Sequence, residues 1–140
     1  MAPKGTLLVM VMVLSASGMT MAWPPWKDHM SVNIINDVGG DPISVHCKSG
    51  DTDLGQHTVF MHQTFGFGFY PNFGGTTQFW CTFNWGSKWQ SFTVWKDIGP
   101  FPGEKSRKRP CDQCVYMVRA DAFWRSEGPG GPFTQIAQWK

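Results

Sequence analysis

Hydrophobic side chains recur at every second position along most of this chain, and this period-two pattern most constrains the fold. The segment Phe65–Phe69 is the plainest case, because its three phenylalanines alternate with two glycines. The stretches 43–48 and 79–83 alternate in the same way, and no window shows convincing helical periodicity. A period of two places alternate side chains on opposite faces of a strand, so the pattern predicts half-buried β-strands.

Further short runs of this kind follow one another along the chain, with turn residues between them. They lie at 32–36, 56–61, 89–95, 114–119, 122–125 and 133–138. Short strands at this spacing are typical of an all-β sandwich or a closely related barrel. We therefore predict a small disulfide-bonded β-sandwich of about eight antiparallel strands. The two glycines between the phenylalanines of 65–69 leave one face bare, which indicates a close neighbour or a sharp twist.

The N-terminus has the features of a secretory signal peptide. A positively charged start precedes an apolar run over 6–14 and then a series of small residues. Thr20-Met21-Ala22 fits the small-x-small rule, so we expect cleavage after Ala22, with Gly18 as the alternative. The apolar run is shorter than the roughly 20 residues that a membrane span needs. We predict a signal peptide at 1–22 and one secreted domain at 23–140, without membrane insertion of the mature chain.

The predicted mature chain is nearly neutral. The whole sequence holds 12 Lys and Arg against 10 Asp and Glu, a net charge of +2, and cleavage would remove only Lys4. Nucleic-acid binding usually demands a strongly basic face, so nucleic acid is not expected as a partner. The chain is rich in Phe and Trp, which each bury on the order of 150–250 Å². A domain of this size can therefore still build a substantial core.

The predicted mature chain contains four cysteines, Cys47, Cys81, Cys111 and Cys114. An even number behind a signal peptide indicates two disulfides. A Cys111–Cys114 bridge would close a very short loop and stabilise little in the chain-entropy model, so we expect each of these two to reach back to Cys47 or Cys81. Which pairs with which stays open. A redox motif or a zinc site would also fit C-x-x-C spacing, but Cys114 opens a strand, and a second close ligand pair is lacking.

Two polar loops are the candidate partner-binding regions. The loop 49–55 carries Asp51 and Asp53 between glycines; it resembles a fragment of a calcium loop but lacks a third ligand position and a distal Glu. The loop 97–110 is long and punctuated by Pro and Gly, which is typical of a recognition loop or of a solvated connector. Its four basic residues are Lys105, Arg107, Lys108 and Arg109.

No catalytic motif of the G-x-S-x-G, P-loop or H-E-x-x-H type occurs in the sequence. His46 and His57 flank the acidic loop and could approach each other across a hairpin, but no Ser or Cys nucleophile signature lies nearby. We interpret these histidines as supports of the loop. We predict that the protein is not an enzyme and needs no cofactor or metal.

Three blocks in combination resemble a known family. They are H-C-K-S…D-x-D-L-G-x-H over 46–57, F-W-C-x-F-x-W over 79–85 and C-D-Q-C-V-Y-M-V over 111–118. Together they resemble the plant self-incompatibility S1 family, also called the S-protein homologues, from about Val32 to Phe123. One departure is Asp121-Ala122, where the family tends to carry Asp-Gly before the aromatic residue.

The resemblance implies a secreted plant ligand. In the founding members, a pistil-secreted protein acts as the ligand of a pollen membrane receptor and triggers rejection of self pollen. We therefore expect a monomer that binds a cell-surface receptor protein through its loops, in pollen rejection or in other cell–cell signalling.

The alternative function is that of a cell-wall carbohydrate-binding module, which would stack sugars on surface tryptophans. A coplanar row of exposed tryptophans would favour this alternative, and buried tryptophans would favour the ligand hypothesis. The candidates are Trp23, Trp26, Trp85, Trp89, Trp95, Trp124 and Trp139.

Overall fold

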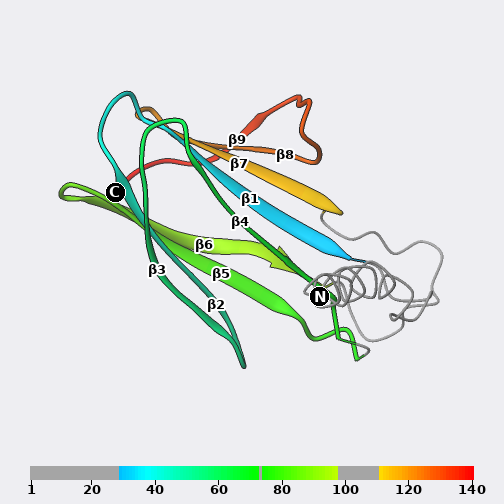
Figure 1. Cartoon of the computed structure of the whole chain (residues 1–140). Coiled ribbons are helices and arrows are strands. Elements are labelled where there is room, and N and C mark those ends of the chain that lie inside the picture. Colours follow the sequence, from blue (N-terminus) through cyan, green and yellow to red (C-terminus); the bar gives the residue numbers. More distant parts are fainter. Residues whose placement is uncertain (1–28, 73, 98–110) are drawn as a thin grey trace, which may run out of the picture.

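Two β-sheets lie face to face in the part of the chain that the structure describes (Figure 1). The computed structural model describes residues 29–72, 74–97 and 111–140, and none of these forms a helix long and apolar enough to cross a membrane. They form nine strands, one more than the predicted number of about eight. In chain order these are β1 (Met30–Asp37), β2 (Ile43–Ser49), β3 (Asp53–Val59), β4 (Thr64–Phe69), β5 (Gln78–Trp85), β6 (Lys88–Lys96), β7 (Gln113–Arg119), β8 (Phe123–Ser126) and β9 (Thr134–Ala137).

One sheet has the strand order β4-β1-β7-β8-β9, and the other has the order β3-β2-β5-β6. The predicted all-β sandwich is confirmed, but the prediction of antiparallel strands is wrong for one pair. β1 and β7 run parallel, with Ser31 opposite Gln113 and Asp37 opposite Arg119. The reason is the path of the chain: β6 ends at the end of the sandwich where β1 begins, so the chain enters β7 beside the start of β1 and runs in the same direction.

The alternating faces seen in the sequence form the core between the sheets. Ile43, Val45 and Cys47 of β2 are buried, as are Phe79 and Phe83 of β5. Between the sheets, aromatic rings contact one another at a few ångströms. The ring centroids of Phe83 and Phe123 are 5.0 Å apart, and those of Phe69 and Trp95 are 5.1 Å apart. Such pairs add to the burial of apolar area, which is the main source of stability in a domain this small.

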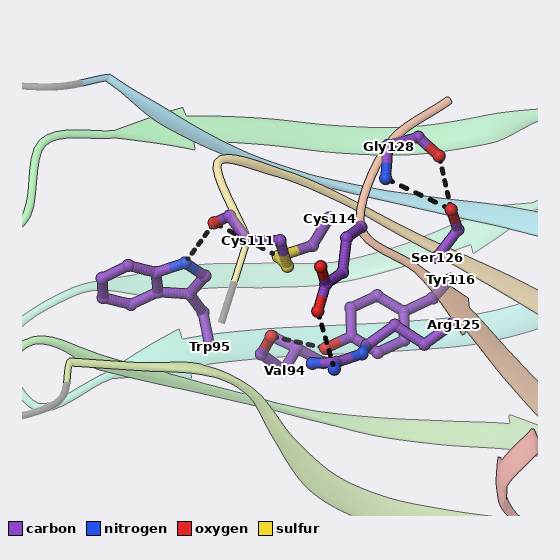
Figure 2. A network of polar contacts seen from close by, with 9 residues as sticks. Val94, Trp95, Cys111, Cys114, Tyr116, Arg125, Ser126 and Gly128 are labelled. Carbon is purple, nitrogen blue, oxygen red and sulfur yellow. Dashed lines mark hydrogen bonds and ion pairs between the residues drawn. A yellow bond between two sulfur atoms is a disulfide. The ribbon is translucent and has the colours of Figure 1, made fainter. Parts of the chain in front are cut away.

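Two buried hydrogen bonds tie β6 of one sheet to the chain around β7 of the other (Figure 2). The Tyr116 hydroxyl donates to the carbonyl oxygen of Val94 at 2.5 Å, and the Trp95 Nε1 donates to the carbonyl oxygen of Cys111 at 3.0 Å. Burial raises the pKa of Tyr116 above its ordinary value. The phenol therefore stays protonated near neutral pH and keeps its donor role.

The disulfides are Cys47–Cys81 and Cys111–Cys114, so the prediction that Cys111 and Cys114 would each reach back to the earlier pair is wrong. Cys47 and Cys81 lie directly opposite each other on the adjacent strands β2 and β5. Cys111 and Cys114 lie at the start of β7, in the other sheet. The prediction compared only the lengths of the loops that each bridge would close. Which sulfur atoms meet depends instead on which strands pair and in which register.

The bare face of β4 has a close neighbour, which is one of the two explanations predicted from the sequence. Gly66 lies opposite Asn33 of β1, and a Cβ added to Gly66 would lie 2.3 Å from the Asn33 Oδ1. A Cβ on Gly68 would lie 2.4 Å from the Nε2 of His29. Side chains from the start of β1 thus occupy the space that side chains on β4 would need.

Candidate functional site

Several connections meet at one end of the sandwich, which we call the loop end (Figure 1). It comprises the β2–β3 turn at 50–52, the β4–β5 connection at 70–77, and the points Asp97 and Cys111, where the chain leaves β6 and approaches β7. These segments gather because β2, β4 and β6 end where β3, β5 and β7 begin. The backbone N–H of Asp97 donates to the carbonyl oxygen of Thr77 at 2.8 Å, which ties two of them together.

Asp53 is held rigidly at the start of β3. Its Oδ1 accepts the backbone N–H of Gly55 at 2.8 Å and lies 2.6 Å from the Nε2 of His46. The Gly55 hydrogen bond, and secondarily His46, lower the pKa of Asp53 below its ordinary value. Gly55 has a φ of 80°, a conformation that favours glycine. The L-G that follows Asp53 in the sequence therefore shapes the bulge that aims this N–H at the carboxylate.

Asp51 closes the turn itself. Its Oδ1 accepts hydrogen bonds from the hydroxyls of Ser49 and Thr52, both at 3.1 Å, while the Ser49 N–H donates to the Thr52 carbonyl at 2.7 Å. Both predicted aspartates are exposed and belong to a preorganised hairpin. Among the described residues, no group of three or more His, Cys, Asp and Glu side chains could hold a metal ion.

The two histidines beside this turn do not form a joint site. His46 pairs with Gln56, and His57 pairs with Val45, so the two imidazoles lie on opposite faces of the hairpin. The His57 ring stacks on Phe65 with centroids 4.3 Å apart, and its Nε2 hydrogen-bonds to the carbonyl of Leu54 at 2.8 Å. The interpretation that each histidine supports the loop is consistent with these contacts.

A cavity of about 410 Å³ opens beside the Asp51 turn, between that turn and the β4–β5 connection. The polar residues on this side of the cavity were not among the site residues predicted from the sequence. Their signal was the run T-T-Q directly after the Gly-rich turn, which places three hydrogen-bonding side chains in sequence. The lining residues used below are Asp51, Thr52, Tyr70, Asn72, Thr76, Thr77 and Gln78.

The basic loop residues Lys105, Arg107, Lys108 and Arg109 lie outside the described residues. The structure places only the two points that flank them, Asp97 and Cys111, at the loop end. The predicted signal peptide, Trp23 and Trp26 likewise lie outside the described part of the chain.

The tryptophan candidates that the structure describes do not form a coplanar row. Trp95 is 1% exposed and belongs to the core. Trp85 and Trp139 pack against each other at the end opposite the loop end, with 52° between their planes. Trp89 is 45% exposed, and the Nζ of Lys140 lies 5.0 Å from the centre of its ring. Trp124 is partly buried, and its Nε1 donates to Asp121.

Comparison with known proteins identifies the family. A family model described as "Plant self-incompatibility protein S1" matches residues 31–139. The chain belongs to this family. The resemblance predicted from the sequence blocks is thereby confirmed.

Individual family members are similar over most of their length. S-protein homolog 5 of Arabidopsis thaliana is 35% identical over 101 residues, which cover 70% of this chain and 71% of that protein. S-protein homolog 2 of the same plant is 36% identical over 110 residues, which cover 78% of this chain and 67% of that protein.

One solved structure shares the fold. It is described as a structure of "SPH (Self-Incompatibility Protein Homologue) proteins, a widespread family of small, highly stable, secreted proteins from plants". It matches with a TM-score of 0.57 and covers 84% of this chain and 99% of its own, at 17% identity.

Proposed function

We propose that this protein is a secreted plant ligand that binds a cell-surface partner through its loop end. Membership of the S1 family carries the proposal, and the solved relative is described as secreted. The geometry supports the choice of surface, because the sandwich presents the Asp51–Asp53 turn at the same end as Asp97 and Cys111. These two are the described residues on either side of the basic loop. Loops on such a scaffold commonly carry recognition, while strands carry packing.

The partner we propose is a receptor protein with an acidic patch near a hydrogen-bonding surface. Lys105, Arg107, Lys108 and Arg109 would contact the acidic patch, and Asp51 and Asp53 would orient the hairpin beside it. The biological role is recognition between cells, of which rejection of self pollen is one form. The mature ligand begins at Trp23 and acts as a monomer.

We propose no catalytic role. An enzyme needs a nucleophile, acid or base positioned together in a cleft. His46 lies on the outer face with Asp53, and His57 lies on the opposite face against Phe65. The two histidines therefore do not share a cleft in which they could act together.

The test is binding of the secreted protein to membranes of plant cells that respond to it. Replacing the four basic loop residues with Ser should slow association and weaken its salt dependence, because opposite charges on two partners accelerate their encounter. A loop that contacts a partner must present these side chains to solvent in the free protein. The melting temperature should then stay unchanged, since exposed substitutions usually alter stability by less than about 0.5 kcal/mol.

The control replaces two exposed lysines at the opposite end, Lys88 and Lys140, with Ser and should bind like the wild type. Equal binding of the loop variant and the wild type would exclude the basic loop as the recognition surface. N-terminal sequencing of the secreted protein should find Trp23 first; an intact Met1 would contradict the secretory route.

A further inference from the structure

The cavity at the loop end is lined by side chains whose hydrogen-bonding groups are already oriented. On one side, Asn72 organises the β4–β5 connection. Its Nδ2 donates to the Thr76 hydroxyl at 2.8 Å, its Oδ1 accepts the Thr76 N–H at 3.1 Å, and its own N–H donates to the Thr77 hydroxyl at 2.7 Å. Both threonine oxygens act as acceptors here, so each O–H is still available as a donor.

Asp51 and Gln78, which also line the cavity, supply acceptors. The Oδ1 of Asp51 accepts from Ser49 and Thr52, which leaves its Oδ2 as an acceptor toward a ligand. The Nε2 of Gln78 donates to the Thr93 hydroxyl at 3.0 Å, which leaves the amide oxygen of Gln78 as a second acceptor. Hydrogen-bonding side chains thus line one cavity from the β2–β3 turn, the β4–β5 connection and the first residue of β5.

Aromatic rings complete the cavity. Tyr70 and Phe69 line it, and the rings of His29 and Tyr70 meet edge to face, with centroids 5.0 Å apart and 61° between the planes. Phe69 packs on Phe79 at 4.7 Å and on the buried Trp95 at 5.1 Å. These contacts connect the Phe69 part of the cavity wall to the core.

The chemistry of this lining selects one class of ligand. Among the described residues that line it, Asp51 is the only charged one, so this part of the lining offers no cation to an acidic ligand. An aromatic surface receives the C–H face of a sugar ring, while hydroxyl, amide and carboxylate groups exchange hydrogen bonds with its hydroxyls. A volume of about 410 Å³ is within the usual range for a small-ligand site, roughly 300–1,000 Å³. We propose that the cavity at the loop end binds a short neutral saccharide.

This site is distinct from a tryptophan platform, since its aromatic wall is Tyr70 and its polar groups belong to the 51–52 and 72–78 segments. It shares Asp51 with the receptor proposal but does not rest on it, because a sugar could bind whether or not the basic loop contacts a protein.

The test is an NMR titration of the secreted protein, labelled with ¹⁵N, with cellotriose, xylotriose, β-1,4-galactotriose and N,N′,N″-triacetylchitotriose. Trigalacturonate serves as the acidic probe and N-acetyl-lysine methyl ester as the cationic probe. At least one neutral trisaccharide should shift the amide signals of Thr76, Thr77 and Gln78 in a saturable manner at millimolar concentration. Trigalacturonate should bind more weakly than the neutral probes.

Variants then locate the site. Asp51→Asn should weaken binding of that trisaccharide roughly tenfold or more, since a hydrogen bond to a charged group alone contributes that much. Tyr70→Ala should also weaken it, because it removes the aromatic surface that receives the sugar ring. Trp89→Ala, which removes an exposed aromatic at the opposite end, should bind like the wild type. Unchanged melting temperatures show that the variants fold.

Three results would overturn the proposal. In the first, no neutral trisaccharide moves the cavity amides. In the second, the lysine ester moves them and the sugars do not, which would assign the cavity to a cationic side chain of a partner. In the third, binding is lost in Trp89→Ala and retained in Tyr70→Ala, which would place sugar binding on the tryptophan surface.

Discussion

Asn36 is a polar residue with 0% exposure, and it holds together the end of the sandwich opposite the loop end. Its Nδ2 donates to the carbonyl oxygens of Asp41 and Val59, both at 2.8 Å, and its Oδ1 accepts the N–H of Val38 at 3.0 Å. Its backbone accepts the N–H of His62, which has a positive φ of 64°. One side chain therefore joins the β1–β2 and β3–β4 connections.

Asn36→Ala should destabilise the protein by about 3 kcal/mol or more, because it leaves several buried backbone groups without hydrogen bonds, each costing about 1–3 kcal/mol. The measurement is urea unfolding followed by tryptophan fluorescence. The matched control is Asn84→Ala, an exposed asparagine of β5, which should change stability by less than about 0.5 kcal/mol. Similar losses for both variants would show that the Asn36 network contributes nothing special.

Asp53 predicts a pH dependence with a definite sign. Its pKa in the folded protein is lowered from 3.8, first by the Gly55 N–H and then by His46. A carboxyl with a depressed pKa stabilises the folded state above its unfolded pKa, and this stabilisation is lost as pH falls through the folded value. Wild type should therefore be more stable than Asp53→Asn near pH 6, and the difference should shrink below about pH 4.

The measurement is the free energy of unfolding of both proteins across this pH range. Carboxyl NMR titration of His46→Ala provides a second readout: because the Gly55 N–H is the larger cause, the pKa of Asp53 should rise only part of the way to 3.8. A stability difference that is constant with pH, or a full return to 3.8, would contradict this account.

At the scale of elements, the two glycines of β4 should differ in how much an added side chain costs. Gly66→Ala should destabilise by about 1–2 kcal/mol, since the new Cβ would press on the half-buried Asn33. Gly68→Ala should cost less, because the side chain in its way belongs to the exposed His29. Replacing both Asn33 and Gly66 with Ala should recover the loss, as alanine then only restricts the unfolded chain.

A double-mutant cycle over Asn33→Ala and Gly66→Ala, measured by chemical denaturation, should show favourable coupling. Additive losses would mean that Gly66 is not needed to make room for the Asn33 side chain.

At the scale of the whole molecule, the two disulfides should contribute unequally. The Cys47–Cys81 bridge spans 34 residues of sequence and the Cys111–Cys114 bridge spans 3. In the chain-entropy model these correspond to about 4 and under about 2 kcal/mol of stabilisation. Since a small domain has only about 5–15 kcal/mol in total, the first bridge is the critical one.

Replacing Cys47 and Cys81 with Ala should therefore lower the unfolding free energy far more than replacing Cys111 and Cys114. All four side chains are buried, so the cost of lost packing is comparable in the two variants. Thermal and urea unfolding of both variants provide the comparison. Equal losses, or a larger loss at Cys111 and Cys114, would show that loop closure does not decide the stability.

The strands and their buried faces were predictable from the residue order, because period-two alternation is a local signal. The alternation over 43–48 and 79–83 predicts that Ile43, Val45 and Cys47 share one face and that Phe79, Cys81 and Phe83 share one face. All six are buried. The family was also predictable, since each of its blocks is continuous in the sequence. The basic residues of 105–109 stay a prediction, as they lie outside the described part of the chain.

The pairing of strands was decided only in three dimensions. A period-two pattern tells which side chains share a face, but it does not tell which strand lies alongside or in which register. The pairing of the strands places Cys47 opposite Cys81 and makes β7 parallel to β1. It also puts His46 and His57 on opposite faces of their hairpin. It also brought the Asp51 turn next to the 72–78 segment to form a cavity. Residues this far apart in sequence meet only when strands pair within a sheet and the two sheets pack on each other.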